Sequence, residues 1–149
     1  MRTVIAASIL SLTWIAGAGA AEAVATTDGE IAGTRIDVKD LKRHSDGTVM
    51  LRFTVYNDGD KVLPLYELMR AGEGHSVDGV YLLDIAGKKK YLVIRDSDQH
   101  CLCSRELPDL AAKSSGNYWA KFPAPPDSVE KVGIVVPHFI PMDDVALGK

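Results

Sequence analysis

The sequence predicts an all-β protein, folded as an antiparallel β-sandwich of about seven short strands. Apolar and polar residues alternate with a period of two, turn residues recur roughly every ten positions, and only brief segments suit a helix. The alternation is clearest over residues 48–56, where the odd positions from Val49 to Val55 are all apolar. Those side chains would line the buried face of one strand, which the turn residues 57–60 would end.

Five further strands follow from the same pattern. The first is expected at the edge of a sheet and ends before the turn 45–47. A hairpin is expected around residues 86–88, which separate two runs rich in β-forming residues. The prolines of residues 123–127 belong to a connection between the last two strands, because proline breaks a helix. The expected strands are 35–41, 48–56, 80–85, 89–94, 117–122 and 131–136, and the short helix candidates are 63–69 and 108–113.

The first 20 residues have the layout of a secretory signal peptide. One positive residue, Arg2, precedes an apolar run too short to span a bilayer, and small residues offer cleavage near Ala20 or Ala23. We expect a flexible arm over residues 21–32 and a single domain over residues 33–149. The mature protein is therefore predicted to be soluble, secreted or periplasmic, and without a membrane span.

Composition and motifs argue against several functions. The 149 residues carry 17 basic and 20 acidic side chains, a net charge of −3, and this balance argues against nucleic acid as a partner. The one basic run, 88–90, is expected at the exposed tip of the hairpin. No Gly-x-Ser-x-Gly, His-Glu-x-x-His or phosphate-binding glycine loop occurs, and adjacent residues such as His75 and Ser76 seldom form a catalytic pair. We therefore expect a non-enzymatic protein without a cofactor.

Reactive side chains gather in one stretch, RDSDQHCLCSR, over residues 95–105. It holds the only two cysteines, Cys101 and Cys103, and export to an oxidising compartment favours a disulfide between them. A three-residue ring constrains the unfolded chain by only about 1.6 kcal/mol, so we expect a local clip that shapes one loop, kinked at Leu102. A redox-active pair is the alternative, because strained and exposed bridges are reduced more easily.

The same stretch holds a candidate ligand site formed by Asp96, Asp98 and His100. The two carboxylates are expected to cap the turn, and a calcium site outside the EF-hand pattern is the alternative. His100 and the cysteines are soft ligands suited to zinc or Cu(I), and His138 with Met142 could complete a copper site. The residues of this metal alternative are His100, Cys101, Cys103, His138 and Met142.

Two longer motifs resemble a bacterial family of secreted immunoglobulin-like domains of unknown function. They are RDSD…CLCS and the ending FPAPP…V…V…VP.F.P..DV, within a similarity that covers about residues 36–145. In longer members the domain often precedes an OmpA-like peptidoglycan-binding domain, and the present sequence contains no such stretch. The resemblance implies an immunoglobulin-like sandwich, similar at fold level also to mycobacterial secreted immunoprotective proteins, and leaves the function open.

The expected function is binding of a protein or cell-envelope component through loops or a sheet edge, the usual recognition surfaces of sandwich domains. Of the adjacent rings of Tyr118 and Trp119, one should face the core and the other should be exposed. The segment PHFIP with Asp143 and Asp144 should run as an extended tail across the sandwich. The alternative function is extracytoplasmic binding of copper or zinc by His100 and the cysteines.

Overall fold

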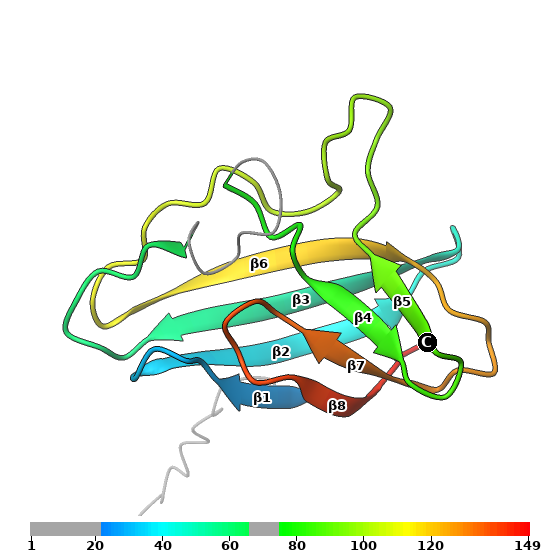
Figure 1. Ribbon diagram of the computed structural model, residues 1–149, viewed down its shortest axis with the longest axis horizontal. Helices are drawn as coiled ribbons and strands as arrows, with labels where there is room; N and C mark the ends of the chain where they lie inside the picture. The colour runs from blue at the N-terminus through cyan, green and yellow to red at the C-terminus, as the bar shows by residue number, and fades with distance from the viewer. Residues whose placement is uncertain (1–21, 66–74) are drawn as a thin grey trace, which may run out of the picture.

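The computed structural model describes residues 22–65 and 75–149 of the chain (Figure 1). Over these ranges the protein is all-β, and its antiparallel strands form two four-stranded sheets that pack as a sandwich. The predicted fold class is confirmed, with eight strands instead of about seven. The strands are β1 (Ala25–Asp28), β2 (Thr34–Arg43), β3 (Thr48–Asn57), β4 (Tyr81–Asp84), β5 (Lys89–Leu92), β6 (Ser114–Pro123), β7 (Lys131–Val135) and β8 (Met142–Ala146).

The two sheets differ in the length of their strands. The first has the order β1-β2-β3-β6 and includes three strands of ten residues. The second has the order β5-β4-β7-β8, with strands of four or five residues. In Figure 1 the second sheet lies in front, and its strands cross the long strands diagonally. The predicted hairpin joins β4 to β5, and its lysines 88–90 are exposed as expected.

The core lies between the sheets and follows the predicted alternation. The four apolar side chains on the inner face of β3 are at most 1% exposed, and Leu82 and Ile134 of the second sheet are fully buried. Tyr118 turns inward on β6, with its ring centroid 5.8 Å from that of Phe53, whereas Trp119 is 38% exposed. One ring inward and its neighbour outward is the arrangement that strand periodicity predicts.

The expected flexible arm, residues 21–32, contains a strand. Residues 25–28 form β1, which pairs with β2 from Ala25 opposite Val38 to Asp28 opposite Arg35. Its β-branched threonines and alternating burial suit it to a sheet edge. The expectation of a flexible arm was therefore wrong for this segment, and β2 is an interior strand instead of the edge strand expected.

Two further expectations also change. Part of the C-terminal segment expected as an extended tail, Met142–Ala146, forms β8, which pairs with β7. The helix candidate 108–113 contains no helix, because Leu110 is tied by two backbone hydrogen bonds of 2.8 Å to Leu63. The other helix candidate, 63–69, lies mostly outside the described residues.

The edges of the two sheets are bridged on both sides of the sandwich. On one side, the Ile140 N–H donates to Asp28 O at 3.2 Å, and the Thr27 hydroxyl donates to Ile140 O at 2.9 Å. On the other side, the N–H of Ile94, just after β5, donates to Lys121 O on β6 at 2.9 Å. The loop that carries the cysteines begins at this second junction, so the fold places it between the two sheets.

Candidate functional site

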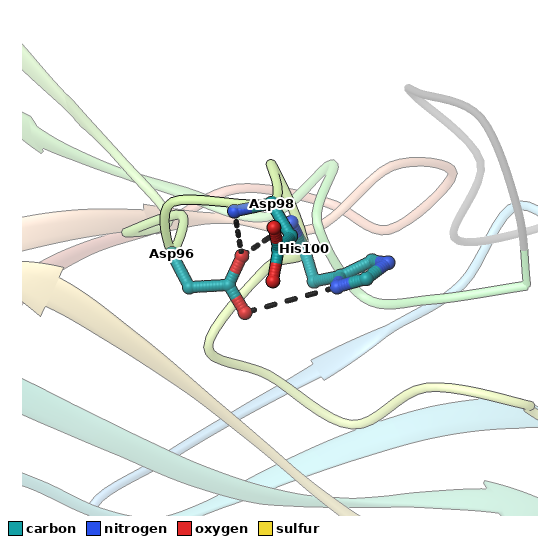
Figure 2. A group of neighbouring side chains, drawn as sticks. All are labelled: Asp96, Asp98 and His100. Atoms are coloured by element: carbon teal, nitrogen blue, oxygen red, sulfur yellow. Dashed lines mark hydrogen bonds and ion pairs between the residues drawn. The ribbon is translucent and has the colours of Figure 1, made fainter.

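The cysteine loop, residues 93–107, opens with a tight hairpin held by the carboxylate of Asp96. Asp96 Oδ1 accepts hydrogen bonds from the N–H groups of Asp98 and His100, both at 2.9 Å (Figure 2). The backbone closes the turn through bonds from Asp96 N–H to His100 O at 2.9 Å and from Gln99 N–H to Asp96 O at 3.1 Å. Asp96 therefore caps the turn with its own side chain, as the sequence predicts for an aspartate in this position.

The disulfide between Cys101 and Cys103 follows this hairpin directly, with the two Cα atoms 5.3 Å apart. Side chains two positions apart share one face of an extended chain. Here that face is the core, since the two cysteines are 6% and 4% exposed, and the chain bends at Leu102 between them as predicted. The bridge is therefore buried, and it clips one loop locally, as the sequence predicted.

The clipped segment continues the first sheet beyond β6. Leu102 O accepts the Lys121 N–H at 2.9 Å, and the Ser104 N–H donates to Trp119 O at 2.9 Å. The Ser104 hydroxyl accepts the Trp119 N–H at 3.0 Å. On its other side, the Leu102 N–H donates to Ile94 O at 2.7 Å. The disulfide thus shapes a short segment that covers the β6 edge and joins it to the chain leaving β5.

A pocket of about 510 Å³ opens beside the cysteine loop. Its second wall is the segment 75–78, which pairs with the end of the loop. Hydrogen bonds of 3.1 Å run from Val77 N–H to Ser104 O and from Leu107 N–H to His75 O. The charged and titratable side chains that line the pocket are His75, Asp78, Arg95, His100, Arg105 and Glu106.

The two arginines of the pocket differ in their partners. Arg95 is held on two sides, with Nη2 2.6 Å from Asp78 Oδ2 and Nη1 donating to Gln99 O at 2.7 Å. The guanidinium of Arg105 is exposed and has no hydrogen bond or ion pair with any described residue. The side chain of Asp78 is 3% exposed, and its Oδ1 has no hydrogen-bond partner within residues 22–65 and 75–149. The pocket therefore offers an unpaired cation and a buried, unsatisfied acceptor.

The residues of the metal alternative are not brought together. Both sulfur atoms belong to the disulfide, so neither is a thiolate ligand. His138 lies against the connection between β1 and β2, where its Nδ1 is 2.9 Å from Glu30 Oε2. Met142 is buried on β8, with 6% of its surface exposed.

The described part of the chain contains one group of residues with metal-ligand spacing. It consists of Asp96, Asp98 and His100, whose ligand atoms lie within 4.8 Å of one another. All three side chains are exposed, and Asp96 Oδ2 lies 3.8 Å from His100 Nδ1 (Figure 2). Hydrogen bonding within the turn accounts for this cluster, so we assign it no metal.

Sequence reasoning found only part of the pocket. The predicted residues that line it are His100 and Cys101, whereas Asp96, Asp98 and Cys103 do not. Arg105 lies inside the quoted motif but was given no role. The ion pair of Asp78 and Arg95 was missed because its members are 17 positions apart in separate segments, and no spacing rule connects them.

The fold and the pocket define an all-β sandwich domain with a disulfide-clipped loop and a polar pocket beside that loop. Comparison with known proteins gives no matching family model, curated relative or solved structure. The resemblance to secreted immunoglobulin-like domains therefore stays a prediction from the sequence. In the two described ranges, no helix has the length and apolar character needed to cross a membrane.

Proposed function

We propose that the protein is a secreted or periplasmic, non-enzymatic binding domain that holds a protein or another cell-envelope component at the pocket. The guanidinium of Arg105 carries this proposal, because it lines the pocket and has no partner in the described chain. Polar groups that converge on a pocket, placed on loops of a rigid scaffold, are typical of binding sites. The location rests on the signal-peptide pattern of the first 20 residues.

The covered sheet edges favour loops over edges as the binding surface. An added strand needs a row of unpaired N–H and C=O groups along an edge. Residues 102–104 occupy one end of the β6 edge, and residues 139–140 lie against β1. The cysteine loop, in contrast, presents its side chains to an open pocket.

The unpaired guanidinium of Arg105 favours a partner with an anionic group. Arg95 is neutralised by Asp78, whereas the Arg105 guanidinium has no counter-charge within hydrogen-bond or ion-pair distance in the described chain. A guanidinium binds carboxylates by two parallel hydrogen bonds. His100 adds a further ring nitrogen to the same pocket. A carboxylate of the partner fits this set.

The test compares the unaltered protein with Arg105→Glu. The purified protein is immobilised and incubated with a solubilised envelope fraction of its source, and the ¹⁵N-labelled protein is titrated with the same fraction. We expect one enriched component, with amide shifts concentrated in residues 75–78 and 95–107, and both signals lost in Arg105→Glu. Lys61→Glu, an equal charge change at an exposed site outside the pocket, should keep both.

Three results would contradict the proposal. The first is enrichment that Arg105→Glu leaves unchanged, and the second is a set of amide shifts confined to another surface. The third is the absence of any enriched component. N-terminal sequencing of protein recovered from the periplasm or the medium checks the location separately, with a start after Ala20 or Ala23 expected.

A further inference from the structure

The solvent face of the second sheet is largely apolar. The residues between the buried positions of β4, β5 and β7 point outward, and apolar side chains occupy most of these places. Leu92 is 59% exposed, and Ile85, in the adjoining hairpin, is 67% exposed. The apolar residues of this second-sheet face are Tyr81, Leu83, Ile85, Leu92 and Val135. A contiguous exposed apolar patch of this kind marks an interaction surface.

One row of residues across this face changes charge from end to end. Leu83 on β4 pairs with Lys90 on β5 and with Gly133 on β7. A Cβ at Gly133 would lie 3.3 Å from Asp143 Oδ1, which places that carboxylate on the same face. From β5 to β8, the row is Lys90, Leu83, Gly133 and Asp143.

The two charges of this row are not partners within one chain. Lys90 Nζ lies 3.6 Å from the ring centroid of Tyr81, and Asp143 has no ion pair or hydrogen bond among the described residues. They lie on the two edge strands of the sheet, roughly 14 Å apart at a strand spacing of about 4.8 Å. The row therefore carries opposite charges at its two ends and no charge between them, and Lys131, exposed at the start of β7, lies outside this row.

We propose that a second copy of this chain packs on the second-sheet face about a two-fold axis parallel to the strands. Such an axis places β5 of one copy opposite β8 of the other. Lys90 then meets Asp143 of the partner subunit, and Leu83 stands opposite Gly133 of the partner subunit, which has no side chain. Each residue of the row therefore faces a complementary residue of the partner subunit when the row runs in the opposite direction. This is the condition for an interface between identical surfaces.

The same geometry indicates a weak dimer. Strands of four or five residues make a small face, and small interfaces belong to the transient class. The Lys90–Asp143 pairs would lie at the rim, where salt screens them. We therefore expect a monomer–dimer equilibrium whose dissociation constant rises with salt concentration.

Sedimentation velocity from about 10 μM to about 1 mM protein at low salt measures this equilibrium, because that range covers weak interfaces. Lys90→Asp should raise the dissociation constant at least tenfold, because each dimer loses two attractions and gains two repulsions. The double variant Lys90→Asp with Asp143→Lys should restore it to within about threefold, since the exchange recreates both pairs. Lys42→Asp, the same charge change at an exposed position of the first sheet, should leave it unchanged.

Gly133→Val tests the shape of the interface independently of charge. The nearest atoms to an added Cβ are 3.3 Å and 3.5 Å away, so the single chain should accommodate the substitution with small shifts. The valine side chain would stand where Leu83 of the partner subunit packs in the dimer, and it should therefore abolish the dimer.

A protein that stays monomeric over the whole concentration range would overturn the proposal. So would a dimer that tolerates both Lys90→Asp and Gly133→Val, or a folded double variant that remains monomeric. Thermal unfolding of each variant, followed by circular dichroism, confirms that it is folded. If the double variant does not fold, Gly133→Val decides the question.

Discussion

The two solvent faces of the sandwich share the same strand geometry but differ in how their charged side chains are arranged. On the first sheet, most charged side chains have a neighbouring partner: Arg52 Nε lies 2.9 Å from Asp40 Oδ2 on β2, and Lys121 Nζ lies 2.8 Å from Asp46 Oδ2 in the turn between β2 and β3. On the second sheet, the charges of Lys90 and Asp143 are separated by apolar residues. A face with paired charges has little to offer a partner, whereas separated charges around an apolar centre can be completed by one.

The outer faces of the two sheets therefore differ in their capacity to bind a partner, whereas their inner faces together form one core. The three long strands of the first sheet run across most of the molecule (Figure 1). Most of the charges on their outer face are paired. The short strands of the second sheet complete the core and leave an apolar outer face. Substitutions on the inner and outer faces of both sheets test this difference.

The largest losses of stability should come from the inner faces, and they should be similar for both sheets. Phe53 and Ile134 are 1% and 0% exposed, on β3 and β7. Phe53→Ala should lower the free energy of unfolding by about 3–5 kcal/mol and Ile134→Ala by about 2–5 kcal/mol, because each leaves a cavity. Urea denaturation measures both. Leu92→Ala, on the outer face, should stay within about 0.5 kcal/mol.

A loss below about 1 kcal/mol for Ile134→Ala would contradict a shared core. It would mean that the second sheet is loosely attached and that only the first sheet unfolds in the observed transition. An unchanged slope of unfolding free energy against urea would show that the variants still unfold as one unit.

Removal of the disulfide should have an intermediate effect, because the bridge acts at the junction of the two sheets. The variant with Cys101→Ala and Cys103→Ala should lose about 1.6 kcal/mol, the constraint of a three-residue ring on the unfolded chain. Hydrogen exchange should quicken at Leu102, Ser104 and Lys121, whose amides depend on the clipped segment. A loss above about 4 kcal/mol would contradict a local role of the disulfide. Unchanged hydrogen exchange at these three amides would show that the disulfide does not hold the segment that joins β6 to the chain leaving β5.

A matched pair of tyrosines compares the outer faces directly. Tyr56 on the first sheet has Arg35 Cζ 4.0 Å and Lys39 Nζ 5.7 Å from its ring centroid, whereas among the described residues Tyr81 on the second sheet has one such cation, Lys90. Tyr56→Leu should cost about 1 kcal/mol and Tyr81→Leu about 0.5 kcal/mol, because the first removes two cation–π contacts. Chemical denaturation of dilute protein measures both. A larger cost for Tyr81→Leu would contradict the interpretation that the first sheet satisfies its own charges.

Much of the fold could be predicted from the sequence because the longest strands show the clearest alternation. The inner face of β3 follows directly from the period of its apolar residues. The strands β1 and β8 were missed because they are short and polar, with sequences ATTD and MDDVA. Pairing with a neighbouring strand decides that they are strands, because the two threonines of β1 are too short a run to predict one.

The candidate site was harder to predict than the fold. The disulfide follows from the number of cysteines and from the predicted export, and the capping role of Asp96 follows from turn chemistry. The burial of the bridge depends on the position of β6, which the cysteines do not reveal. The pocket needs the segment 75–78 to lie beside the cysteine loop, so Asp78 and Arg105 acquire a role only in the folded chain.

The smallest predicted effect is a pH dependence that belongs to the first sheet. The Lys121 ammonium and the Thr48 hydroxyl hydrogen-bond the Asp46 carboxylate and lower its pKa from 3.8 to about 2. A carboxylate with a lowered pKa stabilises the fold above its unfolded pKa, and this contribution disappears as the pH falls from about 4 to about 2. Asp46→Asn should therefore be less stable than the unaltered protein at pH 6, and the difference should shrink toward zero near pH 2. Urea midpoints across this range measure it, and Lys121→Gln should show the same trend because it removes the main partner. A difference that stays constant with pH would mean that the charge of Asp46 does not contribute to the stability of this face.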